Sequence, residues 1–378
     1  MDLLEIRDKI DGIDSQIVDL YEKRMDLCKQ VAEYKIETGK QVFDKEREKQ
    51  KIEKVMDLAH GDFNKQGVAG LFNQLMAISR KLQYGLLIER GIGGKLPFVR
   101  VDDLEYDTAT VVFQGAEGAY SHAAMNKYFG ENVKSFHVET FRDAMLAIDD
   151  GTADYAVLPI ENSTAGSVNE IYDLLEEFEN YIVGEVIIKI EHCLMGVKGT
   201  EISDIKEVYS HAQSLMQSQR FLRDYSWQQI SMKNNAFAAM KVRDDNDKSR
   251  AAIASEYSAK LYGLDILKKG VNNSDTNSTR FIVVSNQKKF VKNANKISIC
   301  LEMPNESGSL FTMLSHFYYN GLNLNRIESR PIEGKNWQYR FFIDFDGNLS
   351  DSAVKNALSG LRQESFNMKI LGNYINAK

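Results

Sequence analysis

Residues 3–37, LLEIRDKIDGIDSQIVDLYEKRMDLCKQVAEYKIE, decide the fold of the amino-terminal part of the chain. Apolar residues recur there at alternating spacings of four and three, which predicts one continuous amphipathic helix. The stripe consists of Ile6, Ile10, Ile13, Ile17, Leu20, Leu27, Val31 and Tyr34. At 1.5 Å per residue the helix is roughly 50 Å long, far longer than a globule of about 90 residues is wide. We therefore expect a second copy of the helix to cover the stripe in a two-fold dimer.

Polar side chains interrupt the apolar stripes of all three helices expected in residues 1–90. They are Arg24 in the first helix, Asp44 and Glu48 in the second, and Ser79 and Gln83 in the third. An unpaired ion inside a helical bundle is strongly unfavourable, so these groups need partners. Arg7 and Lys35 border the first stripe about 42 Å apart, and a pocket that used both would take Arg7 from a partner chain. Two interpretations explain this pattern equally well. The polar groups either form salt bridges that fix the register of the helices, or they line a pocket for a small dianion.

The length of 378 residues predicts two or three domains, and the periodicity changes after the helical part. Residues 91–106, rich in glycine and then in acidic residues, are typical of a linker. In residues 107–286 short apolar runs alternate with helical segments, which predicts an α/β domain. The strands expected there are 111–113, 155–160, 182–190 and 281–284.

The last part of the chain, residues 295–376, has the pattern of a smaller domain. Its order of elements, strand–helix–strand–strand–helix–strand, is typical of a ferredoxin-like fold. In the third of these strands the large apolar residues alternate in the manner of buried core. They are Trp337, Tyr339, Phe341 and Ile343.

The composition excludes several classes of function. Hydrophobic residues make up 43% of the chain and charged residues 27%, as in soluble globular proteins. The net charge of -7 supplies no positive field for nucleic acid. No run approaches the roughly 18 apolar residues of a membrane span, and a secretion signal is not evident. With three widely spaced cysteines, we expect a cytoplasmic protein with reduced thiols. P-loop, GxGxxG and HExxH motifs are absent, which disfavours nucleotide and metal chemistry.

The polar positions of residues 1–90 resemble those of the all-helical chorismate mutases. The matching positions are Arg7, Arg24, Lys35, Asp44, Arg47, Glu48, Ser79 and Gln83. The resemblance implies an all-α fold of three helices in an intertwined homodimer with two active sites, where chorismate rearranges to prephenate. It also implies that Arg24 and Arg7 of the partner subunit clamp the two carboxylates of the substrate.

The resemblance assigns roles to the other residues as well. Lys35 and Gln83 would donate to the ether oxygen, where negative charge develops as the carbon–oxygen bond breaks. The ring hydroxyl, the pocket wall and a carboxylate would be held by Asp44, Arg47, Glu48 and Ser79. A pericyclic reaction needs a compact conformer and fixed donors rather than a base or a nucleophile.

Three strand ends in residues 107–286 carry hydroxyl and amide side chains. Ser121 is placed to cap a helix after the first strand. Asn162, Ser163 and Thr164 follow a later strand, and Gln213 ends the segment Tyr-Ser-His-Ala-Gln at 209–213. Ordinary capping explains each segment alone, but helix starts bind carboxylates, and three such segments at the ends of strands favour a ligand cleft.

Together with the triplet Thr279-Arg280-Phe281, these segments resemble the prephenate dehydratases over about residues 109–285. The resemblance implies two α/β lobes like those of periplasmic solute receptors, with prephenate in the cleft between them. Prephenate would lose carbon dioxide and water to give phenylpyruvate, with Thr279 as the proton donor. The residues expected near the substrate carboxylate are Ser121, Asn162, Ser163, Thr164, Gln213 and Arg280. Neither reaction implies a cofactor, and we expect chelators to have no effect.

Two short motifs in residues 295–376 resemble those of the ACT regulatory domains. They are Gly308, Ser309 and Leu310 at a helix start, and Glu328, Ser329 and Arg330 at a strand end. Plain turn chemistry also accounts for both motifs. The resemblance implies an amino-acid pocket between paired domains, with phenylalanine as the effector that inhibits the enzyme.

The sequence as a whole predicts a bifunctional enzyme of phenylalanine biosynthesis that acts on chorismate and prephenate. We expect a homodimer, and the sequence leaves a tetramer open. The alternative is a non-catalytic sensor with a solute-binding domain and a helical dimerisation arm, but its helices would not need Arg24, Lys35, Glu48 and Gln83. A mutase fused to a dehydrogenase would require a dinucleotide fingerprint, which is absent.

Overall fold

The computed structural model describes residues 2–92 and 96–377. The chain divides into two compact units, which are described separately below. The first unit contains residues 1–97 and 299–369, and the second contains residues 98–298 and 370–378. Among the described residues, no helix is both long and apolar enough to cross a membrane.

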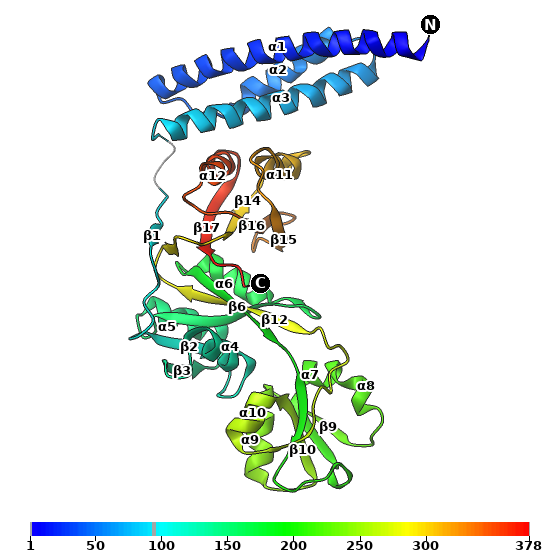
Figure 1. The fold of residues 1–378 in the computed structure, drawn as a ribbon, viewed down its shortest axis with the longest axis vertical. Helices are drawn as coiled ribbons and strands as arrows, with labels where there is room; N and C mark the ends of the chain where they lie inside the picture. The colour runs from blue at the N-terminus through cyan, green and yellow to red at the C-terminus, as the bar shows by residue number, and fades with distance from the viewer. Residues whose placement is uncertain (1, 93–95, 378) are drawn as a thin grey trace. The chain divides into compact units, whose positions relative to one another are not determined.

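Three long helices begin the first unit: α1 (Leu3–Thr38), α2 (Lys45–Leu58) and α3 (Asp62–Glu89) (Figure 1). The periodicity of residues 3–37 therefore predicted α1 to within one residue. Gly39 ends α1 in a left-handed conformation with φ of 69°, which glycine adopts without steric strain. Asp44 begins α2, because its carboxylate accepts a hydrogen bond of 3.0 Å from the backbone N–H of Arg47.

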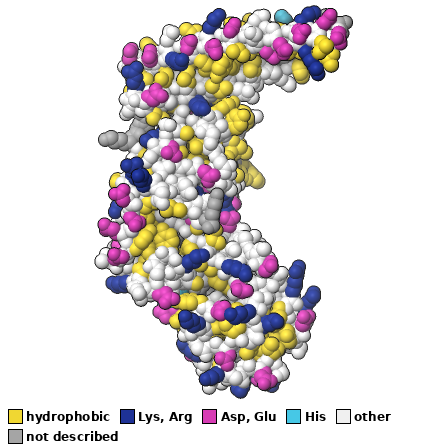
Figure 2. Space-filling model, in the orientation of Figure 1, with side chains coloured by type: hydrophobic (Ala, Val, Ile, Leu, Met, Phe, Trp, Pro, Cys, Tyr) yellow, Lys and Arg dark blue, Asp and Glu magenta, His cyan; other side chains and the backbone are white. Residues whose placement is uncertain are grey.

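The apolar stripe of α1 is left uncovered within a single chain. All eight of its residues are exposed, from 41% for Ile6 to 65% for Leu20. The buried residues of α1 are Met25 and Ala32, which lie outside the stripe. Figure 2 shows hydrophobic side chains between the charged ones along the surface of this helical part. A stripe of this length on the surface of a soluble protein is typical of an interaction face.

The rest of the first unit is built from the carboxy-terminal elements of the chain. These are β14 (Lys296–Glu302), α11 (Ser309–Tyr319), β15 (Leu324–Pro331), β16 (Tyr339–Asp346), α12 (Ser352–Glu364) and β17 (Phe366–Tyr374). The strands lie in the order β15-β16-β14-β17. Helices α11 and α12 pack against each other and against α3 (Figure 1). Strands and helices follow one another here in the order that the sequence predicted.

The predicted third strand of this region begins too early. Trp337 is 80% exposed and Tyr339 is 40% exposed, and only Ile343 of the expected core residues is fully buried. Residues before Tyr339 form a turn in which Gly334 and Trp337 both have positive φ. The expectation that Trp337 and Tyr339 are core residues was wrong, because the alternation of apolar residues continues past the end of the strand into this turn.

The second unit consists of two α/β lobes. The sheet of the first lobe has the order β6-β12-β4-β2-β3, and helices α4 (Tyr120–Phe129), α5 (Phe141–Asp149) and α6 (Asn169–Glu177) pack against it. The strands are β2 (Thr110–Gln114), β3 (Lys134–Val138), β4 (Tyr155–Asn162), β6 (Tyr181–Lys189) and β12 (Ser278–Ser285). Strand β2 is parallel to β3 and β4, while β12 is antiparallel to β4 and β6.

The second lobe is inserted between β6 and β12. Its sheet has the order β11-β7-β10-β8-β9. The strands are β7 (His192–Gly196), β8 (Glu207–His211), β9 (Gln228–Met232), β10 (Arg250–Ser255) and β11 (Asp265–Lys268). The helices are η1 (Ile202–Asp204), α7 (Ala212–Gln217), α8 (Gln219–Leu222), α9 (Asn235–Asp245) and α10 (Glu256–Tyr262). The chain passes between the lobes twice, after β6 and before β12, so the two lobes face each other across these connections (Figure 1).

Part of the predicted linker belongs to the second unit. Strand β1 (Val99–Val101) pairs in parallel with β13 (Lys289–Val291), and the Tyr106 ring packs edge-on against Phe129 at 5.0 Å. Residues 93–95 of the predicted linker lie outside the described residues. The acidic residues 102–105 gave this segment the composition of a linker, although apolar residues on both sides of them anchor it to the domain.

Two candidate active sites

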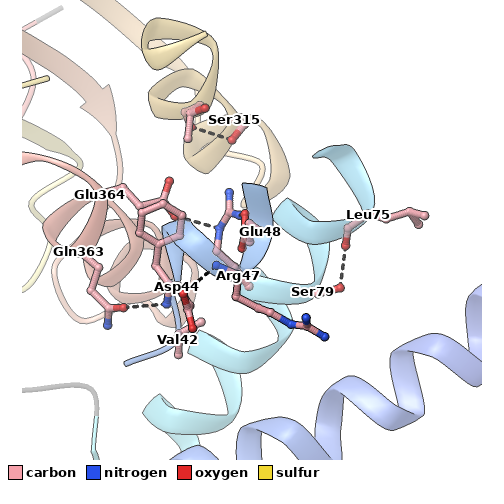
Figure 3. A network of polar contacts seen from close by, with 12 residues as sticks. Val42, Asp44, Arg47, Glu48, Leu75, Ser79, Ser315, Gln363 and Glu364 are labelled. Atoms are coloured by element: carbon pink, nitrogen blue, oxygen red, sulfur yellow. Dashed lines mark hydrogen bonds and ion pairs between the residues drawn. The ribbon is translucent and has the colours of Figure 1, made fainter. Parts of the chain in front are cut away.

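The helices of the first unit bring several of the expected mutase residues together. Arg24 of α1 donates from Nη1 to the hydroxyl of Ser79 on α3 at 2.5 Å and to the carbonyl of Leu75 at 3.2 Å. The Ser79 hydroxyl in turn donates to the Leu75 carbonyl (Figure 3). Ser79 is buried, with 4% of its surface exposed. These contacts fix the Arg24 guanidinium on the inner face of the helical bundle, where it can receive a carboxylate.

Lys35, near the carboxyl end of α1, is held by the loop that follows the helix. Its ammonium donates to the carbonyl of Val42 at 2.6 Å. Burial lowers the pKa of the Lys35 ammonium, and the carboxylates of Asp44 and Glu48 partly oppose this shift. A half-buried cation with two hydrogens left to donate is suited to stabilise negative charge on a ligand.

Gln83 contributes a buried amide with an unused acceptor. Its nitrogen donates to the Ser79 carbonyl at 3.2 Å, but its Oε1 has no hydrogen-bond partner among the described residues. A buried polar atom without a partner typically destabilises a fold by about 1–3 kcal/mol, so such atoms are rare unless a ligand uses the site. The second hydrogen of the amide nitrogen is also available to a ligand.

Glu48 is paired with Arg80, a residue that the sequence did not indicate. The Arg80 guanidinium contacts the Glu48 carboxylate and lies 5.2 Å from the ring centre of Phe43. Asp44 and Arg47 lie at the exposed start of α2, close to Glu48 (Figure 3). Arg7 is exposed near the opposite end of α1 and does not take part in this cluster. The cluster within one chain therefore contains every expected mutase residue except Arg7.

The second candidate site is a cavity of about 650 Å³ between the two lobes of the second unit. Strand ends from both lobes line it, including Gln114, Asn162 and His211, the last residues of β2, β4 and β8. Thr279, in β12, is 8% exposed and faces the cavity. Asn162 donates from Nδ2 to the Thr279 Oγ1 at 2.9 Å. The position of the cavity at the carboxyl ends of strands is the usual one for a ligand site in an α/β protein.

Two of the expected helix starts are wrong in detail. Ser121 is not a helix cap: Ala119 precedes α4, and the Ser121 hydroxyl donates instead to the Gln114 carbonyl at 2.5 Å. Asn162 does not precede a helix, because β4 turns into β5 (Gly166–Ser167) and α6 begins only at Asn169. The Asn162 Oδ1 accepts from the N–H groups of Thr164 and Ala165, which closes this tight turn. Sequence reasoning mistook the hydroxyl-rich turn of a hairpin for the start of a helix.

The third segment, residues 209–213, leads into a helix as its sequence indicated. His211 is the cap of α7, and its Nδ1 accepts from the backbone N–H of Gln213 at 3.3 Å. Gln213 lines the cavity, whereas Ser163 lies beside it, where its hydroxyl accepts from the N–H of Ser278. Thr164 lines the smaller neighbouring cavity, which Gln213 also reaches.

Arg280 does not line the cavity. Neighbouring residues of a strand point to opposite faces of the sheet, so Thr279 and Phe281 face the cavity and Arg280 faces away. Its guanidinium instead pairs with the carboxylates of Glu161 at 3.3 Å and Glu185 at 3.2 Å. The expectation that Arg280 contacts the substrate is therefore not supported by its position.

Sequence reasoning missed a chain of polar side chains that links Thr279 to the second lobe. Asn162 donates to Asn277 Oδ1 at 2.8 Å, and Asn277 donates to Gln217 Oε1 at 3.3 Å. His192 lies between Gln217, at 3.1 Å, and the Tyr120 hydroxyl, at 2.9 Å. Burial lowers the pKa of His192, so the imidazole is neutral at physiological pH.

The cavity is poor in cations. Among its described lining residues, Lys233 is the one lysine or arginine, and it is largely exposed, with its ammonium 3.4 Å from Glu139. Its other polar lining groups are hydroxyls, amides and imidazoles. The site therefore relies on neutral donors rather than on a cluster of positive charges. Within residues 2–92 and 96–377, no group of three or more His, Cys, Asp or Glu side chains is placed to hold a metal ion.

The residues expected to bind an effector lie on two elements of the carboxy-terminal region. Gly308 precedes α11 with φ of 88°, and Ser309 and Leu310 begin the helix. Glu328, Ser329 and Arg330 lie on β15, where Glu328 pairs with Arg326 at 3.0 Å. A cavity of about 520 Å³ in this region is lined by none of these six residues.

Comparison with known proteins connects both sites to enzyme families. A family model for chorismate mutase type II matches residues 6–84, and one for prephenate dehydratase matches residues 111–289. A bifunctional chorismate mutase/prephenate dehydratase of Buchnera aphidicola subsp. Acyrthosiphon pisum is 34% identical over 383 residues, which is 100% of this chain and 97% of that protein.

Solved structures resemble about 71% of this chain. A prephenate dehydratase of Arthrobacter aurescens in complex with L-Phe is 31% identical with a TM-score of 0.66, over 71% of this chain and 90% of that one. GqqA, described as a novel type of quorum-quenching acylase, is 30% identical with the same TM-score, over 71% of this chain and 98% of that one. Because one fold can host different chemistry, assignment rests on the matches that span the whole chain.

The helical bundle and the two-lobed domain define a bifunctional enzyme, a mutase joined to a dehydratase. The chain belongs to the bifunctional chorismate mutase/prephenate dehydratase family. Its substrates are chorismate and prephenate, and its pathway is phenylalanine biosynthesis. The alternative of a non-catalytic sensor is not favoured by these matches.

Proposed function

We propose that chorismate rearranges in the helical cluster around Arg24, Lys35 and Gln83. The observation that carries this proposal is that Arg24 of α1 and Gln83 of α3 both contact Ser79, while the ammonium of Lys35, on the same helix as Arg24, is held by the Val42 carbonyl. In the rearrangement the ether carbon–oxygen bond breaks while a new carbon–carbon bond forms, and no proton is transferred. Lys35 and Gln83 donate to the ether oxygen as negative charge develops on it, and the fixed donors lower the barrier without reorganising.

The second carboxylate of chorismate requires a cation that one chain does not provide. Arg24 can bind one carboxylate in a bidentate manner. Arg7 is 28 residues and about 42 Å along α1 from Lys35, so it reaches such a pocket only from a second chain. The uncovered stripe of α1 supports the same arrangement, because an antiparallel pairing of two α1 helices would bury both stripes. The proposed assembly is a homodimer with two shared mutase sites.

Prephenate is converted in the cavity around Thr279. The bond from the ring to its carboxylate breaks, carbon dioxide leaves, and the electron pair completes the aromatic ring. The ring hydroxyl departs with the electrons of its carbon–oxygen bond and takes the proton of the Thr279 hydroxyl, which gives water. The hydrogen bond from Asn162 to Thr279 Oγ1 stabilises that oxygen as it loses its proton, and solvent then returns the proton. Gln213 and the cavity amides orient the substrate carboxylates.

Phenylalanine is the proposed effector, and the domain that binds it is the ACT-like region of residues 295–376. Support comes from the Gly308–Leu310 and Glu328–Arg330 motifs and from the relative solved in complex with L-Phe. Since these motifs do not line the cavity described in this region, the pocket would form between two paired domains. A calorimetric titration with phenylalanine should show binding, together with loss of dehydratase activity. No heat of binding would contradict the proposal.

An assay with chorismate tests the two activities together. The purified chain should consume chorismate and produce prephenate, which is then converted to phenylpyruvate. Prephenate supplied directly should yield phenylpyruvate without a lag. Consumption of chorismate without phenylpyruvate would contradict the dehydratase assignment, and consumption of prephenate alone would contradict the mutase assignment.

A further inference from the structure

The mutase residue Glu48 is connected to the carboxy-terminal helix α12 through one arginine. Arg80 of α3 contacts the Glu48 carboxylate with Nη1, and its Nε lies 2.9 Å from Oε1 of Glu364. Figure 3 shows Glu48 and Glu364 close together, although they come from distant parts of the chain. The side chains of Arg80 and Glu364 are 7% and 3% exposed. One buried guanidinium is therefore shared by two carboxylates, one from the mutase cluster and one from α12.

Glu364 depends on this contact. Neither of its carboxylate oxygens has a hydrogen-bond partner among the described residues, and His316 Nε2 lies 3.1 Å from Oε2. A buried carboxylate is strongly unfavourable unless a cation compensates it. Glu364 thus holds Arg80 in place by charge, and Arg80 in turn holds Glu48. Both carboxylates raise the pKa of Arg80 against the effect of burial, so the arginine stays charged.

A second contact joins α12 to the loop that holds Lys35. The Gln363 side-chain oxygen accepts from the backbone N–H of Phe43 at 3.2 Å and from the Tyr84 hydroxyl at 3.1 Å. Phe43 follows Val42, whose carbonyl accepts from Lys35. Two adjacent residues of α12 therefore restrain the supports of two mutase residues, Lys35 and Glu48.

We propose that Arg80 and Glu364 are positioning residues of the mutase, so that its turnover depends on the docking of α12. This inference rests on the proposed mutase site. Neither residue touches the substrate: Glu364 fixes Arg80, and Arg80 fixes the Glu48 carboxylate in the pocket wall. The carboxy-terminal region thereby acts on the first reaction through a direct contact, and a shift of α12 would release Glu48.

The test is Glu364→Gln in the full-length chain, which removes the charge and keeps the shape of the side chain. We expect the mutase kcat to fall about tenfold, the size typical of losing a group that supports an active-site residue, with KM changed less than about twofold. Dehydratase activity of the same preparation should remain unchanged, because its cavity does not involve Glu364. Glu364→Asp, which retains the charge, should recover part of the loss.

Glu306→Gln is the matched control, because Glu306 also joins this region to α2 through an ion pair. Its contact with Lys45, at 2.8 Å, is more than half exposed on both sides and does not reach the mutase cluster. This variant should keep both activities.

A second variant, Arg80→Met with Glu364→Gln, removes both members of the buried Arg80–Glu364 pair, and it leaves the partly exposed Glu48 carboxylate without Arg80. Its mutase kcat should also be low while the dehydratase is retained. Wild-type mutase kcat in either Glu364→Gln or the double variant would overturn the proposal, as would an equal loss of both activities. If the unmodified chain lacks mutase activity, the proposed function itself fails and not the positioning role.

Discussion

The two candidate sites of this chain, proposed for related anions, are built from opposite kinds of side chain. The mutase cluster is rich in charge, with Lys35 and Arg80 close to Glu48 and with Arg24 on Ser79, and in the proposed assembly a second chain adds one more cation. The dehydratase cavity is lined within one chain, mostly by hydroxyls, amides and neutral imidazoles. The difference corresponds to the chemistry of the two steps.

The chemistry of each step explains the choice of groups. In the rearrangement, negative charge develops on an ether oxygen without proton transfer, so fixed cations and donors are the effective means of catalysis. In the dehydration, a hydroxide must leave with a proton, so the site needs a placed hydroxyl and a hydrogen bond to support it. The comparison predicts that variants of one site leave the other reaction intact.

The largest effect is expected for Thr279→Ala. Removing the proton donor should lower dehydratase turnover by about 10²- to 10⁴-fold, the range typical of a lost general acid. Steady-state assays with prephenate measure this change. Thr279→Ser, which retains the hydroxyl, should keep substantial activity, and mutase activity should be normal in both variants. Dehydratase activity close to wild type in Thr279→Ala would remove Thr279 from the mechanism.

Lys35→Ala and Gln83→Ala should each reduce mutase turnover by about 10²- to 10³-fold, as loss of one donor to developing charge typically does. Dehydratase activity and the sedimentation coefficient of the protein should not change. Lys29→Ala is a suitable control, because Lys29 is an exposed lysine of the same helix that pairs with Asp26. Near-normal turnover in Lys35→Ala or Gln83→Ala would refute the role of that residue.

A smaller effect concerns pH. In the proposed mechanism Lys35 carries its proton when it stabilises the ether oxygen, so mutase kcat/KM should fall as pH rises through the pKa of Lys35. Burial lowers this pKa, which puts the midpoint of the fall below the ordinary lysine value of about 10.4. Lys35→Arg should not show the fall over that range, since arginine stays protonated. A midpoint at or above the ordinary value would indicate that burial does not control the group.

Local patterns in the sequence were sufficient for much of the fold. The four–three spacing predicted α1, and polar residues within apolar stripes pointed to Arg24 and Gln83. What the sequence could not show depends on contacts between distant residues. Arg80 looks like an ordinary charged residue of α3 until α12 places Glu364 beside it, and the amide chain through Asn277 and Gln217 has no local signal.

Two other differences between prediction and structure could have been foreseen from the sequence. Strand alternation places Thr279 and Arg280 on opposite faces, so their sequence order alone indicates that both cannot line one cavity. Gly334 before Trp337 marks a turn rather than the start of a strand. The hairpin at Asn162 was harder, because its hydroxyl and amide residues are typical of helix caps and of tight turns alike.

A mixing experiment tests most directly whether the mutase site is shared between two chains and the dehydratase site is not. Arg7→Ala and Arg24→Ala should each lose mutase activity and retain dehydratase activity. When the two variants are co-expressed in equal amounts, half of the dimers are mixed and each has one intact mutase site, so about a quarter of wild-type mutase activity should return. No recovery on mixing, or normal mutase activity of Arg7→Ala alone, would contradict the shared site.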